Sequence, residues 1–240
     1  MAVMQLKPVL KNYFLKIVRS SLVSKLLIRL LRIKIWRRGR IQKYLSNTAE
    51  PKLQIGCGRN PLNGWLNTGI SLRESWIGVY LNAGQPFMLP DESFNYVFSE
   101  HLFEHLTYPQ ALIMLVESYR VLKPGGVIRI ATPDLRFLIG LYQEPEKPIH
   151  KEYIEYSAKN GGLPASPVYV VNRFHTTWGH QIIYDKETLE NLLVSTGFKN
   201  ITICEVGKSN HKALCGVEGH FKLIPEEFNL LETMIMEGTK

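Results

Sequence analysis

Residues 51–60, Pro-Lys-Leu-Gln-Ile-Gly-Cys-Gly-Arg-Asn, constrain the fold more than any other stretch of the chain. A short apolar run that breaks into Gly-Cys-Gly is typical of a buried parallel strand that ends in a sharp turn. Gly56 and Gly58 would let a ligand approach the bare backbone at that turn. In open α/β sheets, nucleotide-like ligands bind at such carboxyl ends of strands. The stretch alone leaves a second interpretation open, because a Gly-x-Gly after a strand is often only a turn.

Strands and helices alternate after Pro51, which predicts a mostly parallel sheet. We expect strands at 52–56, 65–70, 77–82, 94–99, 127–132, 201–206 and 231–236. We expect helices at 107–122, which Lys-Pro-Gly-Gly ends, and at 186–196, with Asp185 as the cap and Gly197 as the stop.

The region 135–182 is too long for a plain connection between two elements of this pattern. Long insertions after the carboxyl end of a strand often form lids and substrate pockets. Arg173, His175, Trp178 and His180 are crowded together here. The region therefore predicts a lid with a substrate pocket, and a purely structural flap is the alternative.

Three further motifs carry a resemblance to a known family. They are Gly64-Trp65-Leu66-Asn67, residues 94–105 (Phe-Asn-Tyr-Val-Phe-Ser-Glu-His-Leu-Phe-Glu-His) and residues 120–134 (Arg-Val-Leu-Lys-Pro-Gly-Gly-Val-Ile-Arg-Ile-Ala-Thr-Pro-Asp). With the Leu-x-x-Gly-Cys-Gly stretch, they resemble the class I S-adenosylmethionine (SAM)-dependent methyltransferases over about residues 51–240. The resemblance implies a doubly wound, Rossmann-like sheet of seven strands with the last antiparallel. It also implies SAM as cofactor and methyl transfer to an oxygen or nitrogen atom of a small molecule, such as a saccharide or secondary metabolite.

The resemblance assigns cofactor binding to the ends of the first four predicted strands. The residues are Gly56, Cys57 and Gly58 in the glycine turn, Gly69 and Asn82 after the second and third strands, and Ser99 and Glu100 after the fourth. Family members usually carry an acidic residue where Gly69 stands, and that carboxylate accepts both ribose hydroxyls. Gln54 and Asn82 are likewise uncharged where acids are common. Cofactor affinity is then reduced, or Glu74 or another group takes over, or the chain is a non-catalytic binding or scaffold protein.

Methyl transfer to a hydroxyl or protonated amine requires a group that removes a proton. Neutral histidine suits this task near pH 7. His101 follows the fourth predicted strand, whereas His175 and His180 belong to the predicted lid, and these three are our catalytic candidates. His105 fits better as a structural residue at a helix start.

The stretch His101-Leu-Phe-Glu-His105 also matches the inverted zinc-protease pattern His-x-x-Glu-His. It lies at a predicted strand-to-helix turn, and no third ligand is evident nearby, so we attribute the match to chance and expect no metal. The three cysteines, Cys57, Cys204 and Cys215, have no paired spacing. They predict a reducing compartment, the cytoplasm, and neither a disulfide framework nor a zinc site.

Basic residues are concentrated at the start of the chain. Residues 1–45 contain 12 of the 29 lysines and arginines and no acidic residue, which leaves a balance of −4 for the remainder. Within 22–33, leucines, Val23 and Ile33 form a wide apolar arc, and Lys25, Arg29 and Arg32 share another side. We therefore expect a basic amphipathic helical arm at 1–48 and one catalytic domain at 49–240.

Charges interrupt the arm too often for a membrane span, and no cleavage site marks it as a signal peptide. Three roles stay open: packing on the domain or on a twin subunit, association with an anionic membrane surface, or binding to nucleic acid. Sparse aromatic residues disfavour nucleic acid. The sequence does not determine the oligomeric state.

Overall fold

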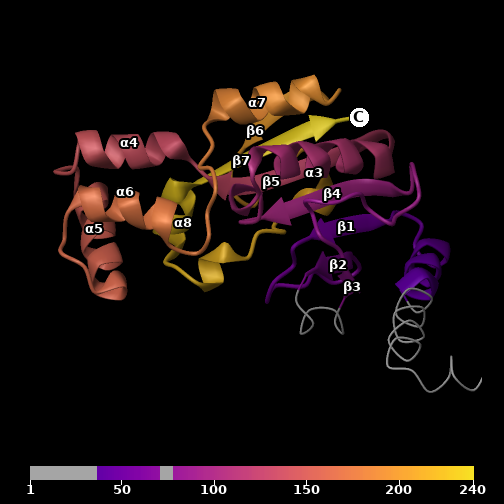
Figure 1. The fold of residues 1–240 in the computed structure, drawn as a ribbon, viewed down its shortest axis with the longest axis horizontal. Coiled ribbons are helices and arrows are strands. Elements are labelled where there is room, and N and C mark those ends of the chain that lie inside the picture. The colour runs from indigo at the N-terminus through magenta and orange to yellow at the C-terminus, as the bar shows by residue number, and fades with distance from the viewer. Residues whose placement is uncertain (1–36, 71–77) are drawn as a thin grey trace, which may run out of the picture. The chain divides into compact units, whose positions relative to one another are not determined.

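The computed structural model describes residues 37–70 and 78–240, and the chain divides at Asn47 into two compact units. In the first unit, residues 37–46 are helical. The helix expected at 22–33 lies outside the described residues. The second unit, from Thr48 to Lys240, holds the sheet (Figure 1).

The sheet of the second unit has seven strands in the order β3-β2-β1-β4-β5-β7-β6. Their bounds are β1 Lys52–Ile55, β2 Leu66–Gly69, β3 Val79–Tyr80, β4 Phe94–Glu100, β5 Leu122–Pro133, β6 Lys199–Cys204 and β7 Thr233–Thr239. β1 to β5 pair in parallel, whereas β7 is antiparallel to both β5 and β6. This confirms the predicted seven-stranded Rossmann-like sheet with its antiparallel last strand.

Several strand boundaries differ from the prediction, and for two of the strand starts the structure shows the reason. β5 begins at Leu122 instead of Val127, because the predicted turn pairs with the end of the chain: Gly125 N donates to Lys240 O (3.0 Å), and Lys240 N donates to Gly126 O (2.9 Å). β7 begins at Thr233, since the residues before it form helix α8, Glu226–Glu232. The acidic pair at the start of α8 suits the positive end of a helix dipole.

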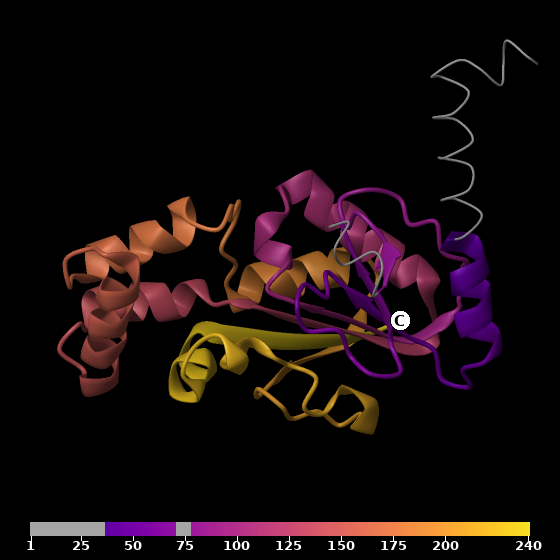
Figure 2. The ribbon, with the colours of Figure 1, turned by 90° about the horizontal axis from the view of Figure 1, so that it is seen from below.

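Helices α3 (Tyr108–Val121) and α7 (Lys186–Ser195) lie on one face of the sheet (Figure 2). α3 begins at a capping box between Thr107 and Gln110, and the Asp185 side chain accepts a hydrogen bond from Thr188 N at the start of α7. Their apolar sides pack on β5 and on β6 and β7, respectively. Both helices were predicted within one residue at each end.

The opposite face is covered differently from the expected doubly wound arrangement. Residues 56–65 join β1 to β2 without a helix. A long connection, residues 205–225 (the strap), crosses this face instead (Figure 2). Leu214 and Val217 of the strap pack with Trp65, Phe98 and Ile235 of the domain core. Burial of these side chains substitutes for the missing helix.

Buried charges fasten the strap to the sheet. Arg129 of β5 is 0% exposed. Its guanidinium donates to Glu218 of the strap (2.5 Å) and to Glu237 of β7 (2.6 Å). It also donates to the carbonyl oxygens of Lys208 (3.0 Å) and Glu205 (3.3 Å). These bonds fasten the start of the strap, at residues 205 and 208, and a point beyond its middle, Glu218, to the sheet.

Three helices follow β5 at the carboxyl ends of the parallel strands (Figures 1 and 2). They are α4 (Leu135–Gln143), α5 (Pro148–Gly161) and α6 (Pro167–Thr176). Together with Phe228 of α8 they enclose an apolar cluster of their own, with Phe137, Tyr153 and Phe174 at its centre. The region predicted as a lid is therefore a small helical subdomain beside the sheet edge.

Candidate active site

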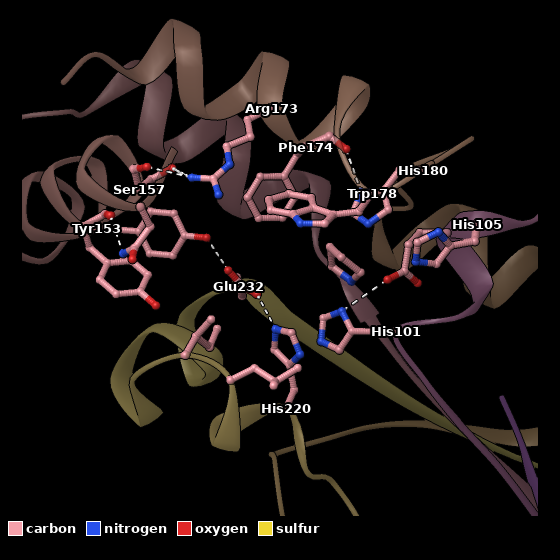
Figure 3. A pocket seen from close by; sticks show the side chains of 16 residues that line it. His101, His105, Tyr153, Ser157, Arg173, Phe174, Trp178, His180, His220 and Glu232 are labelled. Atoms are coloured by element: carbon pink, nitrogen blue, oxygen red, sulfur yellow. Dashed lines mark hydrogen bonds and ion pairs between the residues drawn. The ribbon is translucent and has the colours of Figure 1, made fainter. Parts of the chain in front are cut away.

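A cavity of about 560 Å³ lies between the helical subdomain and the carboxyl end of the sheet (Figure 3). The sheet edge contributes His101, Glu104, His105 and Pro133, and the strap and α8 contribute His220, Leu223, Ile224 and Glu232. The helical subdomain and the segment after it contribute Tyr153, Tyr156, Ser157, Asn160, Arg173, Phe174, Trp178 and His180. Three separate parts of the chain thus converge on one space.

His101 directly follows β4 and points into the cavity (Figure 3). Its φ is +45°, a left-handed conformation that is uncommon for residues other than glycine. The main chain is held there because His101 N donates to Ala131 O (2.9 Å). The imidazole Nδ1 lies 3.2 Å from Glu104 Oε1.

Glu104 is 0% exposed, and its other oxygen accepts a hydrogen bond from the Thr132 hydroxyl (3.0 Å). Burial acts to raise the pKa of Glu104, but the hydrogen bond and charge of His101 outweigh it, so the pKa lies below its usual value. Burial likewise acts to lower the pKa of His101, and Glu104 together with Glu232 and Glu100 raises it overall. The two groups therefore stabilise each other as an ion pair.

His180 also lines the cavity, but its pKa is shifted in the opposite direction from that of His101. Its Nδ1 lies 2.7 Å from the carbonyl oxygen of Phe174. A carbonyl oxygen only accepts, so Nδ1 carries the hydrogen and the neutral ring keeps its lone pair on Nε2. Burial lowers the pKa of His180. A lowered pKa favours the neutral form of this ring, which lines the cavity.

The other two predicted histidines differ in position. His175 lies exposed on α6 and is outside the set of residues that line the cavity. His105, in the short 3-10 helix Phe103–His105, packs edge-on against His180 with ring centroids 4.7 Å apart. The pattern His101-x-x-Glu104-His105 thus lies in a turn with a short 3-10 helix, as predicted, and not inside the long helix of a zinc protease.

The glycine turn follows β1 as predicted. Gly56 and Gly58 have φ of +71° and +49°, the region that glycine adopts readily. Between them, Cys57 is buried and its N donates to Thr68 O (2.8 Å). A Cβ on Gly58 would meet no atom within 4 Å, so the turn faces open space.

Two buried polar atoms near this turn have no hydrogen-bond partner among the described residues. One is Ser99 Oγ on β4, and Ser99 pairs with Ile55 at the end of β1. The other is Asn60 Nδ2, two residues after Gly58. Buried polar groups are normally satisfied, so such atoms indicate a missing ligand or water. The residues at the turn therefore fit a polar cofactor such as SAM.

The remaining predicted cofactor residues are engaged within the protein. The Gln54 and Asn67 side chains hold the backbone of Leu62, and Asn82 Oδ1 accepts a hydrogen bond from Gly84 N (3.0 Å). Gly69 ends β2, and its carbonyl accepts a hydrogen bond from Leu81 N (2.9 Å). Glu74 lies outside the described residues.

Glu100 has a role that the sequence did not indicate. Its carboxylate accepts hydrogen bonds from Gly219 N (2.8 Å) and His220 N (2.9 Å), so it holds the tip of the strap. A Cβ on Gly219 would lie 2.0 Å from Asn60 Nδ2, which shows how closely the strap approaches the segment after the glycine turn. The Glu100 carboxylate therefore anchors the strap.

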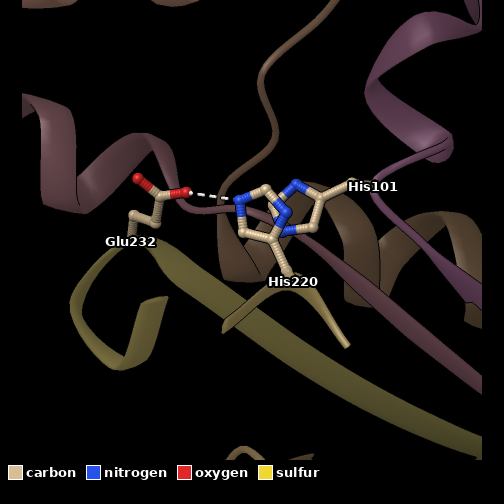
Figure 4. A group of neighbouring side chains, drawn as sticks. All are labelled: His101, His220 and Glu232. Atoms are coloured by element: carbon tan, nitrogen blue, oxygen red, sulfur yellow. Dashed lines mark ion pairs between the residues drawn. The ribbon is translucent and has the colours of Figure 1, made fainter. Parts of the chain in front are cut away.

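Sequence reasoning missed His220 and Glu232, which the strap and α8 bring to the cavity (Figure 4). The His220 ring stacks on His101 with centroids 3.8 Å apart. His220 Nε2 lies 3.3 Å from Glu232 Oε1, and the other oxygen of Glu232 accepts a hydrogen bond from the Tyr153 hydroxyl. The only signal in the sequence was a histidine and an acid in a segment rich in breaks, which is too common to predict a site.

A comparison with protein families matches the part of the chain that runs from β1 into β5. Residues 53–130 match a family model described as a methyltransferase domain. No curated protein matches the chain. No helix within residues 37–70 and 78–240 is long and apolar enough to cross a membrane.

Solved structures that resemble the chain include three described as SAM-dependent methyltransferases. Those from Thermotoga maritima and Archaeoglobus fulgidus both have a TM-score of 0.47, with 17% and 19% identity. The matches cover 90% of this chain and 97% of the first, and 95% of this chain and 99% of the second. The Mesorhizobium loti structure has a TM-score of 0.48 and 13% identity, covering 80% of this chain and 92% of its own. These values are too low to support a statement about activity.

Proposed function

We propose that this chain is a class I SAM-dependent methyltransferase and that it methylates an oxygen or nitrogen atom of a small acceptor; the match of residues 53–130 to a methyltransferase-domain model supports the proposal. The observation that carries the proposal is the cavity at the carboxyl ends of β4 and β5, which holds the neutral histidine His180. A volume of about 560 Å³ lies within the usual range for small-ligand sites, about 300–1,000 Å³.

The cofactor, when bound, supplies an electrophilic methyl group on a sulfonium. The residues that would hold it are the backbone of Gly56 and Gly58, the Ser99 hydroxyl and the Asn60 amide. Each offers a group that the protein itself leaves accessible or unsatisfied. This set differs from the expected one, because Glu100 is bound to the strap and Gly69 offers no carboxylate.

His180 would remove the proton from the acceptor. The Phe174 carbonyl fixes its tautomer, and its lowered pKa keeps Nε2 unprotonated at neutral pH. The proton passes from the acceptor atom to Nε2, and the ring becomes an imidazolium. Glu104 lies close enough to stabilise that charge, since its carboxylate acts to raise the pKa of His180.

The walls of the cavity favour an acceptor with both hydroxyl groups and apolar faces. Tyr156 and Trp178 offer aromatic rings, and Asn160 and Ser157 offer hydrogen-bonding groups. Arg173 stacks on Trp178 with its guanidinium carbon 4.9 Å from the ring centroid. A saccharide or a related metabolite has this mixed character, so we take it as the acceptor class.

A matched pair of variants tests the role of His180. His180→Gln should lower methyl transfer to a panel of monosaccharides by about 10²–10⁴-fold, measured as release of S-adenosylhomocysteine, because it removes the proton acceptor. SAM affinity, measured by calorimetry, should stay unchanged. His175→Gln is the control, since His175 is exposed on α6. Equal losses in both variants would contradict the assignment.

The pH profile gives a second reading of the same role. Because burial lowers the pKa of His180, activity should persist below pH 6.5, the ordinary histidine value, and decline only when the ring is protonated. A profile that already falls above that value would exclude His180 as the proton acceptor.

A second candidate function is a binding protein without turnover. Gly69 in place of the usual acid and the strap packed near the glycine turn favour it. Calorimetry with SAM and S-adenosylhomocysteine separates the two functions. Micromolar binding of SAM supports the enzyme, and lack of binding to either compound supports the second candidate.

A further inference from the structure

We propose that His101, His220 and Glu232 bind a divalent first-row transition-metal ion, with Zn²⁺ as the first candidate. The three side chains meet on one wall of the cavity although they come from β4, the strap and α8 (Figure 4). One possible ligand atom from each lies within 4.8 Å of the others. Two imidazoles and one carboxylate are a common donor set for catalytic zinc.

The groups behind these ligands are arranged as in protein metal sites. His101 Nδ1 is bound to Glu104 Oε1 at 3.2 Å, which directs Nε2 away from Glu104. A carboxylate on the far nitrogen of a metal-binding histidine fixes its tautomer and orientation. Tyr153 donates to one oxygen of Glu232 and leaves the other, Oε1, facing His220. Two of the three ligands are thus held by a partner of their own.

The backbone also positions the two histidines. His101 is held in a left-handed conformation (φ +45°) at the end of β4. His220 N is bound to the carboxylate of Glu100, the residue before His101, at 2.9 Å. This link carries the strap to the sheet edge and places the two rings face to face, with centroids 3.8 Å apart. Strained backbone that the surrounding structure enforces is frequent at functional sites.

Burial of charge favours an ion at this place. Glu104 and Glu232 are 0% and 5% exposed. Glu104 is already paired with His101, so the buried carboxylate that an ion would compensate directly is Glu232. An ion on the far nitrogen of His101 would also replace the positive charge that a protonated His101 presents to Glu104. In a tetrahedral site with bonds of about 2.0–2.2 Å, ligand atoms lie about 3.3–3.6 Å apart. His220 Nε2 and Glu232 Oε1 are already 3.3 Å apart. His101 Nε2 lies 3.5 Å from the Thr233 hydroxyl, and its ring would have to turn out of the stack on His220 to complete the set.

A second trio, Glu104, His105 and His180, also has ligand atoms within 4.8 Å of one another. It suits a metal less well, because Glu104 uses its oxygens for His101 and Thr132, and His180 Nδ1 is bound to the Phe174 carbonyl. Of the sequence pattern His101-x-x-Glu104-His105, His101 belongs to the first trio, and Glu104 and His105 belong to the second. The further ligands that the sequence lacked come from the strap and α8.

Three protein ligands leave a coordination position open toward the cavity, as in catalytic zinc sites. An acceptor hydroxyl bound there would lose its proton more easily, because the ion stabilises the alkoxide. Activation of an acceptor hydroxyl by the ion rests on the proposed methyl transfer. Binding of the ion itself does not depend on that reaction. Metal binding is measured without SAM or acceptor, so failure of either proposal can be distinguished.

The test uses the full chain without a histidine tag, freed of metal by a chelator and titrated with Zn²⁺ in a calorimeter and with Co²⁺ in a spectrophotometer. We expect one ion per chain and the visible absorption of Co²⁺ with nitrogen and oxygen ligands. Glu104→Gln, which replaces the carboxylate behind His101 by an amide, should lower the affinity by about 10–100-fold; because Glu104 also belongs to the second trio, His220→Gln and Glu232→Gln decide between the two trios. His220→Gln and Glu232→Gln should lower it further.

His175→Gln is the matched control, and its affinity should equal that of the parent chain. If His220→Gln fails to fold by circular dichroism, Glu232→Gln carries the test, because the amide keeps the shape of the carboxylate. Absence of saturable binding by the parent chain would overturn the proposal. So would unchanged affinity in Glu232→Gln, or a loss confined to His105→Gln and His180→Gln, which would place the ion at the second trio.

Discussion

Arg129→Met tests whether the buried charges of the strap hold the domain together. Arg129 is fully buried between Glu218 and Glu237, and it donates to the carbonyls of two strap residues. Methionine fills much of the space but leaves the buried carboxylates of Glu218 and Glu237 without their cation. Removing one partner of a buried ion pair costs about 3–5 kcal/mol, so we expect a loss of at least about 4 kcal/mol in the free energy of unfolding.

For a domain of this size, a loss of about 4 kcal/mol corresponds to a fall in Tm of roughly 8–16 °C. Urea and thermal unfolding, followed by circular dichroism, measure it. Arg129→Met combined with Glu218→Gln should recover part of the loss, since one stranded charge is then gone. The difference in free energy of unfolding between the parent chain and Arg129→Met should also become smaller as the pH falls from about 8 to about 5. A buried carboxylate without a cation has a higher pKa in the folded than in the unfolded chain, so protonation favours the folded variant.

Arg136→Met is the matched control, because Arg136 is exposed on α4 and a change there should stay within about 0.5 kcal/mol. A loss below about 1 kcal/mol in Arg129→Met would refute the reasoning. It would mean that the apolar packing of Leu214 and Val217, together with the Glu100 hydrogen bonds, holds the strap without Arg129.

Three further predictions concern the cofactor site and the arm. Gly58→Val should abolish SAM binding, measured by calorimetry. The fold should survive at a backbone cost of about 1–2 kcal/mol, because a side chain at Gly58 meets no neighbouring atom. Gly125→Val is the control: its φ is also positive and its surroundings are also open, so SAM affinity should stay unchanged. Gly69→Asp should tighten SAM binding by about tenfold, because one charged hydrogen bond contributes about 1.5–3 kcal/mol, and an unchanged affinity would show that the ribose is held elsewhere. If the 12 basic residues of 1–45 associate with membranes, the full chain should co-sediment with anionic vesicles, less so in high salt, and its truncation to 46–240 should not. Binding by the truncated chain would rule out this role.

The succession of strands and helices along the chain and the glycine turn followed from the sequence by itself. Alternating apolar runs, Gly56 and Gly58, and the cap at Asp185 are local features, and local periodicity and backbone freedom suffice to predict what they form. The same holds for His101 and His180, because one follows a strand end and the other lies in a long insertion after a strand, where sites tend to form.

Only the tertiary structure decided which distant groups meet. His220 and Glu232 reach His101 because the strap crosses the face that lacks a helix between β1 and β2, and no local pattern encodes that path. Glu100 became an anchor for the strap, and Arg129 joined two acids that are distant from it in the sequence. Such pairings depend on which surface each segment covers, so the energetics of burial across the whole fold determine them.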